Sequence, residues 1–270
     1  MLAAAPVVMV IGAAEAGKTT FTAWLANLLH ARAHRVAIVD ADVGQSEIGP
    51  PATVGLGAVR APVTRPGDAA LIAFAFVGAM SPGRQPWRTA AATGRLVLRA
   101  RAAFDRVLVD TSGFVAGGFA AALKQRKIAA ADPDLVVLLQ HAEECEHLVR
   151  PLAERARPLV RRLPVVTGGR PRSPAVRRRH RDDALARYFT DARSAVLDTA
   201  RVALRSLRDE PAALAHVPPG ALVELRDAEA RTLGLGIVEA IDEERATLRV
   251  RTTASAGAVA SVTIGEPAAA

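Results

Sequence analysis

The chain has 270 residues, of which 50% are hydrophobic and 23% charged, so a large folded core is expected and a mainly disordered chain is excluded. Its formal net charge is +8, and only three of its 35 basic residues are lysines. The single cysteine excludes internal disulfides, and no apolar run reaches the ~18 residues needed to cross a bilayer. We therefore expect a cytoplasmic protein that does not contact membranes.

Patterns of strands and helices alternate through the first part of the chain. Short apolar runs predict buried strands, and the stretches between them place apolar residues at helical spacing. This alternation predicts right-handed βαβ units in an α/β fold with a mostly parallel sheet. The predicted strands are 7–11, 35–39, 71–77, 106–109, 135–139 and 159–166, and the predicted helices are 19–31, 89–101, 117–129 and 143–157.

The alternation of strand and helix patterns ends near residue 167. An arginine-rich segment follows and is predicted to be helical from Pro174 to Tyr188. Short, partly alternating segments near the C-terminus predict a small β module, with strands at 222–225, 235–241, 247–250 and 259–264. We therefore divide the chain into a main domain, an arginine-rich segment with connecting helices, and a small β domain, with the ranges 1–167, 168–215 and 216–270.

A glycine-rich loop that fits G-x-x-x-x-G-K-[ST] follows the first predicted strand. Such a loop, between a strand and a helix, points backbone N–H groups and the positive end of the helix at phosphate oxygens. Lys18 is expected to bridge the β- and γ-phosphates of ATP, and the hydroxyl of Thr19 to hold Mg²⁺. The alternative is a chance match in an ordinary turn. The predicted nucleotide-binding residues are Gly12, Ala13, Ala14, Glu15, Ala16, Gly17, Lys18, Thr19 and Thr20.

Aspartates follow two of the predicted strands, at the edge of the sheet where ligands bind. Asp40 and Asp42 are two residues apart in an extended segment, so we expect them to point in opposite directions and to differ in role. Beside a γ-phosphate, a carboxylate can accept the proton of an attacking hydroxyl or hold Mg²⁺ through water. The alternative is a solvent-exposed turn. Asp110 ends a later strand and is the Walker B candidate near Mg²⁺.

Much of the basic excess is concentrated between Arg150 and Arg181. Arg177 and Arg181 are four residues apart, so a helix would place them on one face. Two guanidinium groups on one helix can close over a phosphoryl group and neutralise charge in the transition state. They could instead bind nucleic-acid phosphates or belong to a solvated basic surface.

Together these motifs resemble the P-loop polynucleotide 5′-hydroxyl kinase family, which includes the pre-mRNA cleavage-complex kinase subunit, the pre-rRNA-processing kinase and archaeal relatives. The resemblance implies a P-loop NTPase fold with an arginine-rich helical lid and a small C-terminal β module. It also implies ATP-dependent phosphorylation of the 5′-OH ends of RNA or DNA. It is carried by the phosphate loop, D-A-D-V-G-Q-S-E-I-G-P-P-A-T-V at 40–54, F-V-G-A-M-S-P at 76–82, V-D-T-S-G-F-V at 109–115, L-K-Q-R-K-I at 123–128 and R-S-P-A-V-R-R-R-H-R at 172–181.

The resemblance also implies roles for individual residues. It makes Asp42 the general base and Asp40 a support for Mg²⁺, while the residue pattern alone leaves open which of the two is the base. It makes Arg177 and Arg181 the lid residues over the ATP phosphates. Phe114 stands where many members have a tryptophan that stacks on the terminal base, so a looser grip on that base is expected. The predicted substrate-binding residues are Gln45, Thr111, Phe114 and Arg172.

Two other functions remain open. An adaptor or switch that binds ATP within an RNA-processing assembly would need the phosphate loop but neither a general base nor a lid. A metallochaperone-type or GTPase regulator would need metal-ligand clusters or a guanine-reading N-K-x-D motif, and the sequence has neither. The set of Lys18, Asp42, Arg177 and Arg181 favours the kinase.

Overall fold

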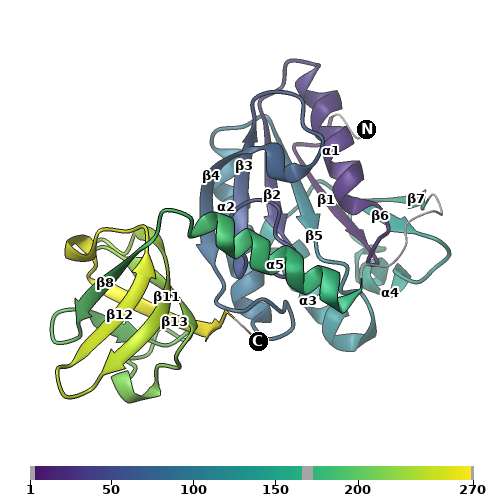
Figure 1. Cartoon of the computed structure of the whole chain (residues 1–270). Coiled ribbons are helices and arrows are strands. Elements are labelled where there is room, and N and C mark those ends of the chain that lie inside the picture. Colours follow the sequence, from purple (N-terminus) through teal and green to yellow (C-terminus); the bar gives the residue numbers. More distant parts are fainter. Residues whose placement is uncertain (1–3, 166–172, 269–270) are drawn as a thin grey trace. The chain divides into compact units, whose positions relative to one another are not determined.

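The structure, a computed structural model, describes residues 4–165 and 173–268 (Figure 1). These residues form two compact units. The first comprises the chain up to residue 76 together with residues 81–184. The second comprises residues 77–80 and the chain from residue 185 onward.

A seven-stranded sheet forms the centre of the first unit, with the order β4-β3-β2-β5-β1-β6-β7. The five strands from β2 to β7 in this order run parallel, whereas β3 and β4 are antiparallel to their neighbours. The α/β class and the mostly parallel sheet are thus confirmed. The strands are β1 (Val7–Gly12), β2 (Val36–Ala41), β3 (Thr53–Val59), β4 (Ala70–Phe76), β5 (Arg106–Thr111), β6 (Leu135–Gln140) and β7 (Leu159–Pro164).

Helices cover both faces of this sheet. On one face, alternate strand residues such as Val8 and Val10 pack with Leu25 and Leu29 of α1 in a buried apolar cluster. On the other face, α2 and α3 lie side by side and approach so closely that a Cβ on Gly94 of α2 would lie 2.6 Å from a backbone oxygen of α3. The helices are α1 (Lys18–His30), α2 (Pro86–Arg101), α3 (Gly117–Ala131), α4 (Glu146–Val149) and α5 (Pro174–Tyr188).

Two elements of this unit differ from the sequence prediction. The helix predicted for 143–157 is wrong in length, because α4 ends at Val149 and only a 3₁₀ turn, Arg150–Leu152, follows. Pro151 explains this early end, since proline lacks an N–H group and disfavours helical geometry in the residue before it. Strand β3 was not predicted, because Gly55 and Gly57 interrupt its apolar pattern. The structure requires glycine at Gly55, where a Cβ would lie 1.9 Å from the carbonyl oxygen of Ile48.

The second unit holds a six-stranded sheet with the order β8-β12-β11-β10-β13-β9. The four segments predicted as strands near the C-terminus are strands in the structure. The apolar core of this unit includes Leu225, Val250 and Val262. The prediction of connecting helices before residue 215 was wrong, since β8 and β9 lie there. Leu197 is the only buried residue of β8, so that strand shows no apolar alternation. The strands are β8 (Arg193–Asp198), β9 (Ala203–Arg205), β10 (Ala221–Arg226), β11 (Thr232–Asp242), β12 (Thr247–Thr252) and β13 (Ser261–Pro267).

The helix predicted to start at Pro174 is confirmed as α5. Among the helices of the described residues, none combines the length and the apolar character that crossing a bilayer requires.

Candidate active site

The glycine-rich loop lies between β1 and α1, as predicted. Gly12 is the last residue of β1, and a Cβ there would lie 2.6 Å from the carbonyl oxygen of Leu139, so only glycine fits. Gly17 precedes α1 with φ of +79°, a left-handed conformation that favours glycine. No side chain of the described residues caps the N-terminus of α1. Its backbone N–H groups are therefore available to an anion such as a phosphate.

Lys18 begins α1 and is buried. Its Nζ donates a hydrogen bond of 2.6 Å to the carbonyl oxygen of Ala13 in the same loop. Burial lowers the pKa of Lys18, while the carboxylates of Asp110 and Asp42 act in the opposite direction and raise it. Lys18 thus lies close to two of the three predicted acidic residues.

Asp110 lies near the end of β5, the strand between β2 and β1 in the sheet. Its backbone is in register with Val10 of β1 and with Asp40 of β2. Burial raises the pKa of its carboxyl group to about 6, whereas Lys18 and a hydrogen bond from the side chain of Thr19 lower it. Its Oδ1 atom is buried and has no hydrogen-bond partner among the described residues. A buried, unpartnered carboxylate oxygen beside a threonine hydroxyl fits a divalent cation, so Thr19 and Asp110 suit the predicted Mg²⁺.

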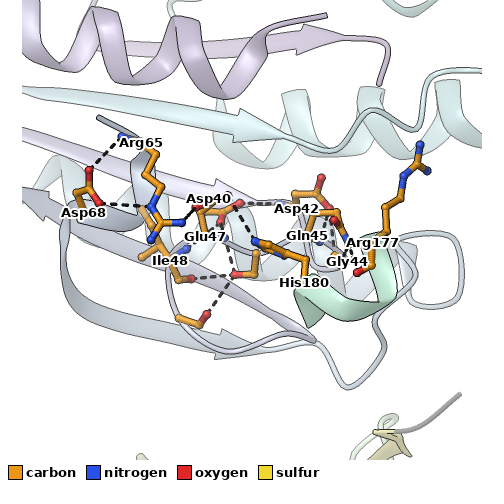
Figure 2. A network of polar contacts seen from close by, with 12 residues as sticks. Asp40, Asp42, Gly44, Gln45, Glu47, Ile48, Arg65, Asp68, Arg177 and His180 are labelled. Carbon is orange, nitrogen blue, oxygen red and sulfur yellow. Dashed lines mark hydrogen bonds and ion pairs between the residues drawn. The ribbon is translucent and has the colours of Figure 1, made fainter. Parts of the chain in front are cut away.

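Asp40 holds the loop that follows β2 (Figure 2). Its Oδ1 accepts a hydrogen bond of 3.0 Å from the N–H of Asp42. Its Oδ2 accepts bonds of 2.6 and 3.0 Å from the N–H groups of Glu47 and Ile48. Burial, with Asp110 and Asp42 close by, raises the pKa of Asp40 to about 8. Both oxygens of Asp40 are therefore engaged in shaping the 40–48 loop.

Asp42 has different surroundings from Asp40. It is half-buried, and its Oδ1 accepts hydrogen bonds of 3.1 Å from the N–H groups of Gly44 and Gln45. Its Oδ2 forms no hydrogen bond with any side chain or backbone group that the structure describes. Asp42 therefore offers one carboxylate oxygen to a ligand at the edge of the sheet.

Two buried lysines from α3 complete the site, and sequence reasoning assigned them no role. The Nζ of Lys124 donates a hydrogen bond of 2.9 Å to Oγ1 of Thr111 and another to the carbonyl oxygen of Ser112. The Nζ of Lys127 donates a bond of 2.6 Å to the carbonyl oxygen of Ala41. Burial lowers the pKa of both amines, to about 8 for Lys127, and the nearby aspartates oppose this shift. Through these hydrogen bonds the two amines fix the ends of β2 and β5 beside the acidic cluster.

Helix α5 contacts the 40–48 loop (Figure 2). The Nε2 of Gln45 donates a bond of 3.1 Å to the carbonyl oxygen of Arg177, and Nε2 of His180 lies 3.6 Å from Oε1 of Glu47. The side chain of Arg177 extends away from these contacts in Figure 2. Arg177 and Arg181 form no ion pair with a residue that the structure describes. Gln45, predicted to contact substrate, thus connects the loop to the helix that carries the predicted lid arginines.

The other predicted substrate residues have varied surroundings. Thr111 is buried, and its hydroxyl donates a hydrogen bond of 2.8 Å to the carbonyl oxygen of Val10. This hydroxyl is therefore engaged inside the fold. Phe114 is 37% exposed, with its ring centroid 6.4 Å from that of Phe119. Arg172 lies outside the described residues. Of the predicted nucleotide-binding residues, those exposed to solvent are Ala14, Glu15, Gly17 and Thr20.

Comparison with known proteins agrees with this geometry. A family model described as the P-loop of the mRNA cleavage and polyadenylation factor CLP1 matches residues 12–191. A polyribonucleotide 5′-hydroxyl-kinase of Pyrococcus furiosus is 35% identical over 186 residues, which cover 69% of this chain and 51% of the relative. The polyribonucleotide 5′-hydroxyl-kinase Clp1 of Xenopus tropicalis is 31% identical over 202 residues, covering 71% of this chain and 45% of the relative.

A solved structure supports the fold. A chain in the structure of a wild-type Clp1p–Pcf11p complex has a TM-score of 0.73 at 13% identity, and the match covers 96% of this chain and 74% of that one. This likeness concerns the fold alone. The present chain spans about half the length of the archaeal and vertebrate relatives that it matches.

Proposed function

The chain belongs to the CLP1 P-loop family, and on this premise we propose that it is an ATP-dependent polynucleotide 5′-hydroxyl kinase. It transfers the γ-phosphate of ATP to the 5′-OH end of RNA or DNA. The archaeal relatives, which are named as polyribonucleotide 5′-hydroxyl-kinases, support this activity. The observation that carries the proposal is the open Oδ2 of Asp42 in the acidic cluster next to Lys18.

The phosphate loop binds ATP in this proposal. Its backbone N–H groups and the ammonium of Lys18 contact the phosphates, which requires Lys18 to exchange its bond to Ala13 for a phosphate oxygen. Thr19 and Asp110 would hold Mg²⁺, and this ion, when bound, would neutralise charge on the β- and γ-phosphates.

Asp42 acts as the general base. Its free Oδ2 accepts the proton of the 5′-hydroxyl while that oxygen forms a bond to the γ-phosphorus, and the bond from phosphorus to the bridging oxygen breaks to release ADP. Asp40 is poorly suited to this role, because both of its oxygens already accept hydrogen bonds from the 40–48 loop. We therefore assign Asp40 to the support of the loop that carries Asp42.

Helix α5 is the proposed lid. Arg177 and Arg181 close over the ATP phosphates and neutralise charge that develops during transfer. Their lack of ion pairs with described residues leaves both guanidinium groups available for this task. Gln45 and His180 join the helix to the same loop that carries Asp42, which couples closure of the lid to the position of the base. Phe114 stacks on the terminal base of the substrate.

Transfer of γ-labelled phosphate from ATP to 5′-OH oligonucleotides tests the proposal. The wild-type protein should label RNA or DNA oligonucleotides, and Lys18→Ala and Asp42→Asn should reduce labelling to near background. A wild-type protein that hydrolyses ATP but labels no oligonucleotide of any length or sugar type would overturn the kinase assignment. That result would favour an ATP-binding adaptor or switch, which needs neither Asp42 nor the lid arginines.

A further inference from the structure

Exposed aromatic rings gather beside the candidate active site. The described residues expose four aromatic side chains, and one of these, Trp24, lies on α1. The other three lie in the loop after β5 and in the first turns of α2 and α3. They are Phe114, Phe119 and Trp87, with 37%, 52% and 65% of their surfaces exposed. We refer to these three rings, together with Arg126, as the aromatic strip.

The aromatic strip follows the line along which α2 and α3 lie side by side. The Phe119 ring lies next to Gly83, where a Cβ would be 3.5 Å from it. The guanidinium carbon of Arg126 lies 3.6 Å from the centroid of the Trp87 ring. Phe119 and Arg126 are seven residues apart and so share one face of α3, about 10 Å apart along its axis. The rings therefore follow one another along these two helices.

One end of the strip meets the phosphate loop. Gly113 packs so tightly against this loop that a Cβ on it would lie 2.5 Å from the Cα of Ala14. Phe114 is the next residue, and its ring neighbours that of Phe119. The strip thus begins beside the phosphate loop and extends away from it over α2 and α3.

The charge of these two helices suits a polyanion. Neither α2 nor α3 contains an aspartate or a glutamate. The guanidinium of Arg126 lies over the Trp87 ring, so one cation stands next to an exposed ring. Among the arginines of α2, Arg88 bonds to the carbonyl oxygen of Phe76 and Arg101 pairs with Asp132, while Arg95 and Arg99 are exposed. Exposed rings beside positively charged side chains are what single-stranded nucleic acid binds, because every base has a face that can stack.

We propose that the aromatic strip binds the single-stranded segment that follows the 5′-terminal nucleotide of the substrate. Bases beyond the first stack on Phe119 and Trp87, and Arg126 orients the Trp87 ring and contacts a backbone phosphate. This inference rests on the proposed function, since the kinase site defines where the 5′ end lies. It predicts that affinity for substrate grows with the length of the single strand.

Kinetics with substrates of two lengths test the proposal. For a 5′-OH dodecanucleotide, Trp87→Ala should raise KM about 10-fold and leave kcat nearly unchanged, as expected for the loss of one stacking contact. For a dinucleotide, which cannot reach Trp87, KM should stay the same. Trp87→Phe, which retains a ring, should recover most of the loss. The control is Trp24→Ala, which removes a ring of similar exposure from the other face of the sheet.

Direct binding separates this proposal from the kinase assignment. Anisotropy of a fluorescent single-stranded dodecanucleotide should show about 10-fold weaker binding to Trp87→Ala and weaker binding to Arg126→Gln, whether or not phosphate is transferred. If the wild-type protein phosphorylates ends but Trp87→Ala binds the dodecanucleotide normally, the strip proposal is overturned and the strip is left to a protein partner. If oligonucleotides bind through Trp87 but are never phosphorylated, the kinase assignment fails and the strip proposal stands. An equal loss in Trp24→Ala would also overturn the strip proposal.

Discussion

The ammonium of Lys127 donates a hydrogen bond of 2.6 Å to the carbonyl oxygen of Ala41, which ties helix α3 to the last residue of strand β2. The residue after Ala41 is Asp42, the proposed base. A fully buried amine thus positions the backbone next to the group that is proposed to accept the substrate proton.

Replacing Lys127 should therefore destabilise the fold. Lys127→Met leaves the carbonyl oxygen of Ala41 unsatisfied and removes positive charge from the buried aspartates, so we expect a loss of about 3 kcal/mol in the free energy of unfolding. Lys127→Arg keeps the charge but adds volume at a fully buried position, and it should also destabilise the protein. Urea denaturation measures both effects. A Lys127→Met protein as stable as the wild type would contradict this role.

Asp42 and Asp40 should respond differently to replacement by asparagine. Asp42→Asn should lower kcat about 10²-fold or more with little change in the midpoint of thermal unfolding, because it removes a general base. Asp40→Asn should lower the unfolding midpoint, because an amide NH₂ group cannot accept the loop N–H groups that Asp40 holds. Steady-state kinetics and thermal denaturation of the two variants distinguish the roles. The reverse pattern would make Asp40 the base.

The lid arginine should affect turnover more than substrate affinity. Arg177→Ala should reduce kcat about 10²-fold or more, because a guanidinium group that neutralises transition-state charge contributes at that step. Arg178→Ala is the matched control, since Arg178 lies on the same helix but is exposed and paired with Asp182 at 3.9 Å. Rate measurements at saturating oligonucleotide provide the comparison. Loss of RNA affinity at unchanged turnover would instead identify Arg177 as a nucleic-acid contact.

Gln45 should hold α5 on the 40–48 loop. Gln45→Ala removes the hydrogen bond to the carbonyl oxygen of Arg177, so amide hydrogens in the first turns of α5 should exchange faster with solvent. Hydrogen exchange followed by mass spectrometry measures this change, with α1 as an internal reference that should not change. Equal exchange in both proteins would show that the helix is held by other contacts.

The exposed ion pair between Arg35 and Asp105 should make a pH-dependent contribution to the stability of the fold. A hydrogen bond from the Arg35 side chain holds the pKa of Asp105 at about 2, below its ordinary value of 3.8. A lowered folded-state pKa stabilises the fold above the unfolded pKa, and this contribution is lost as the pH falls through the folded pKa. Asp105→Asn should therefore be less stable than the wild type at pH 6, and the difference should shrink as the pH falls below 3.8 and vanish below about pH 2. Chemical denaturation at several pH values measures it, and a difference at pH 2 as large as that at pH 6 would exclude the ion pair as its cause.

Much of the fold could be predicted from local patterns. Strands β1, β2, β5 and β6 are buried on both faces and form continuous apolar runs, which the sequence displays directly. Strand β3 could not be predicted in this way, because its glycines interrupt the apolar pattern. The reason for glycine at Gly55 is visible only in the structure, where the backbone of Ile48 packs against it. Strand β8 buries one side chain, so its state depends on pairing with β12, which lies about fifty residues further along the chain.

Those parts of the candidate site could be predicted whose position follows from the spacing of residues in a motif or at a strand end. The phosphate loop, Asp42 and Asp110 lie together at the edge of the sheet because the motif and the strand ends determine their positions. The roles of Thr111 and Gln45 were not predictable, since each side chain bonds to a partner distant in sequence. Lys124 and Lys127 were also missed, because lysine is normally exposed and only the packing of α3 buries them. The one available signal was their rarity in a chain that otherwise uses arginine.

The burial of these lysines has a consequence for chemical modification. Lys18, Lys124 and Lys127 are the only lysines of the chain, and all three are buried around the acidic cluster. The folded protein therefore shields every side-chain amine from acylating reagents and from enzymes that acetylate lysine. Acylation of a lysine would report that the core of the site has opened, which makes amine labelling a direct measure of local unfolding at the candidate active site.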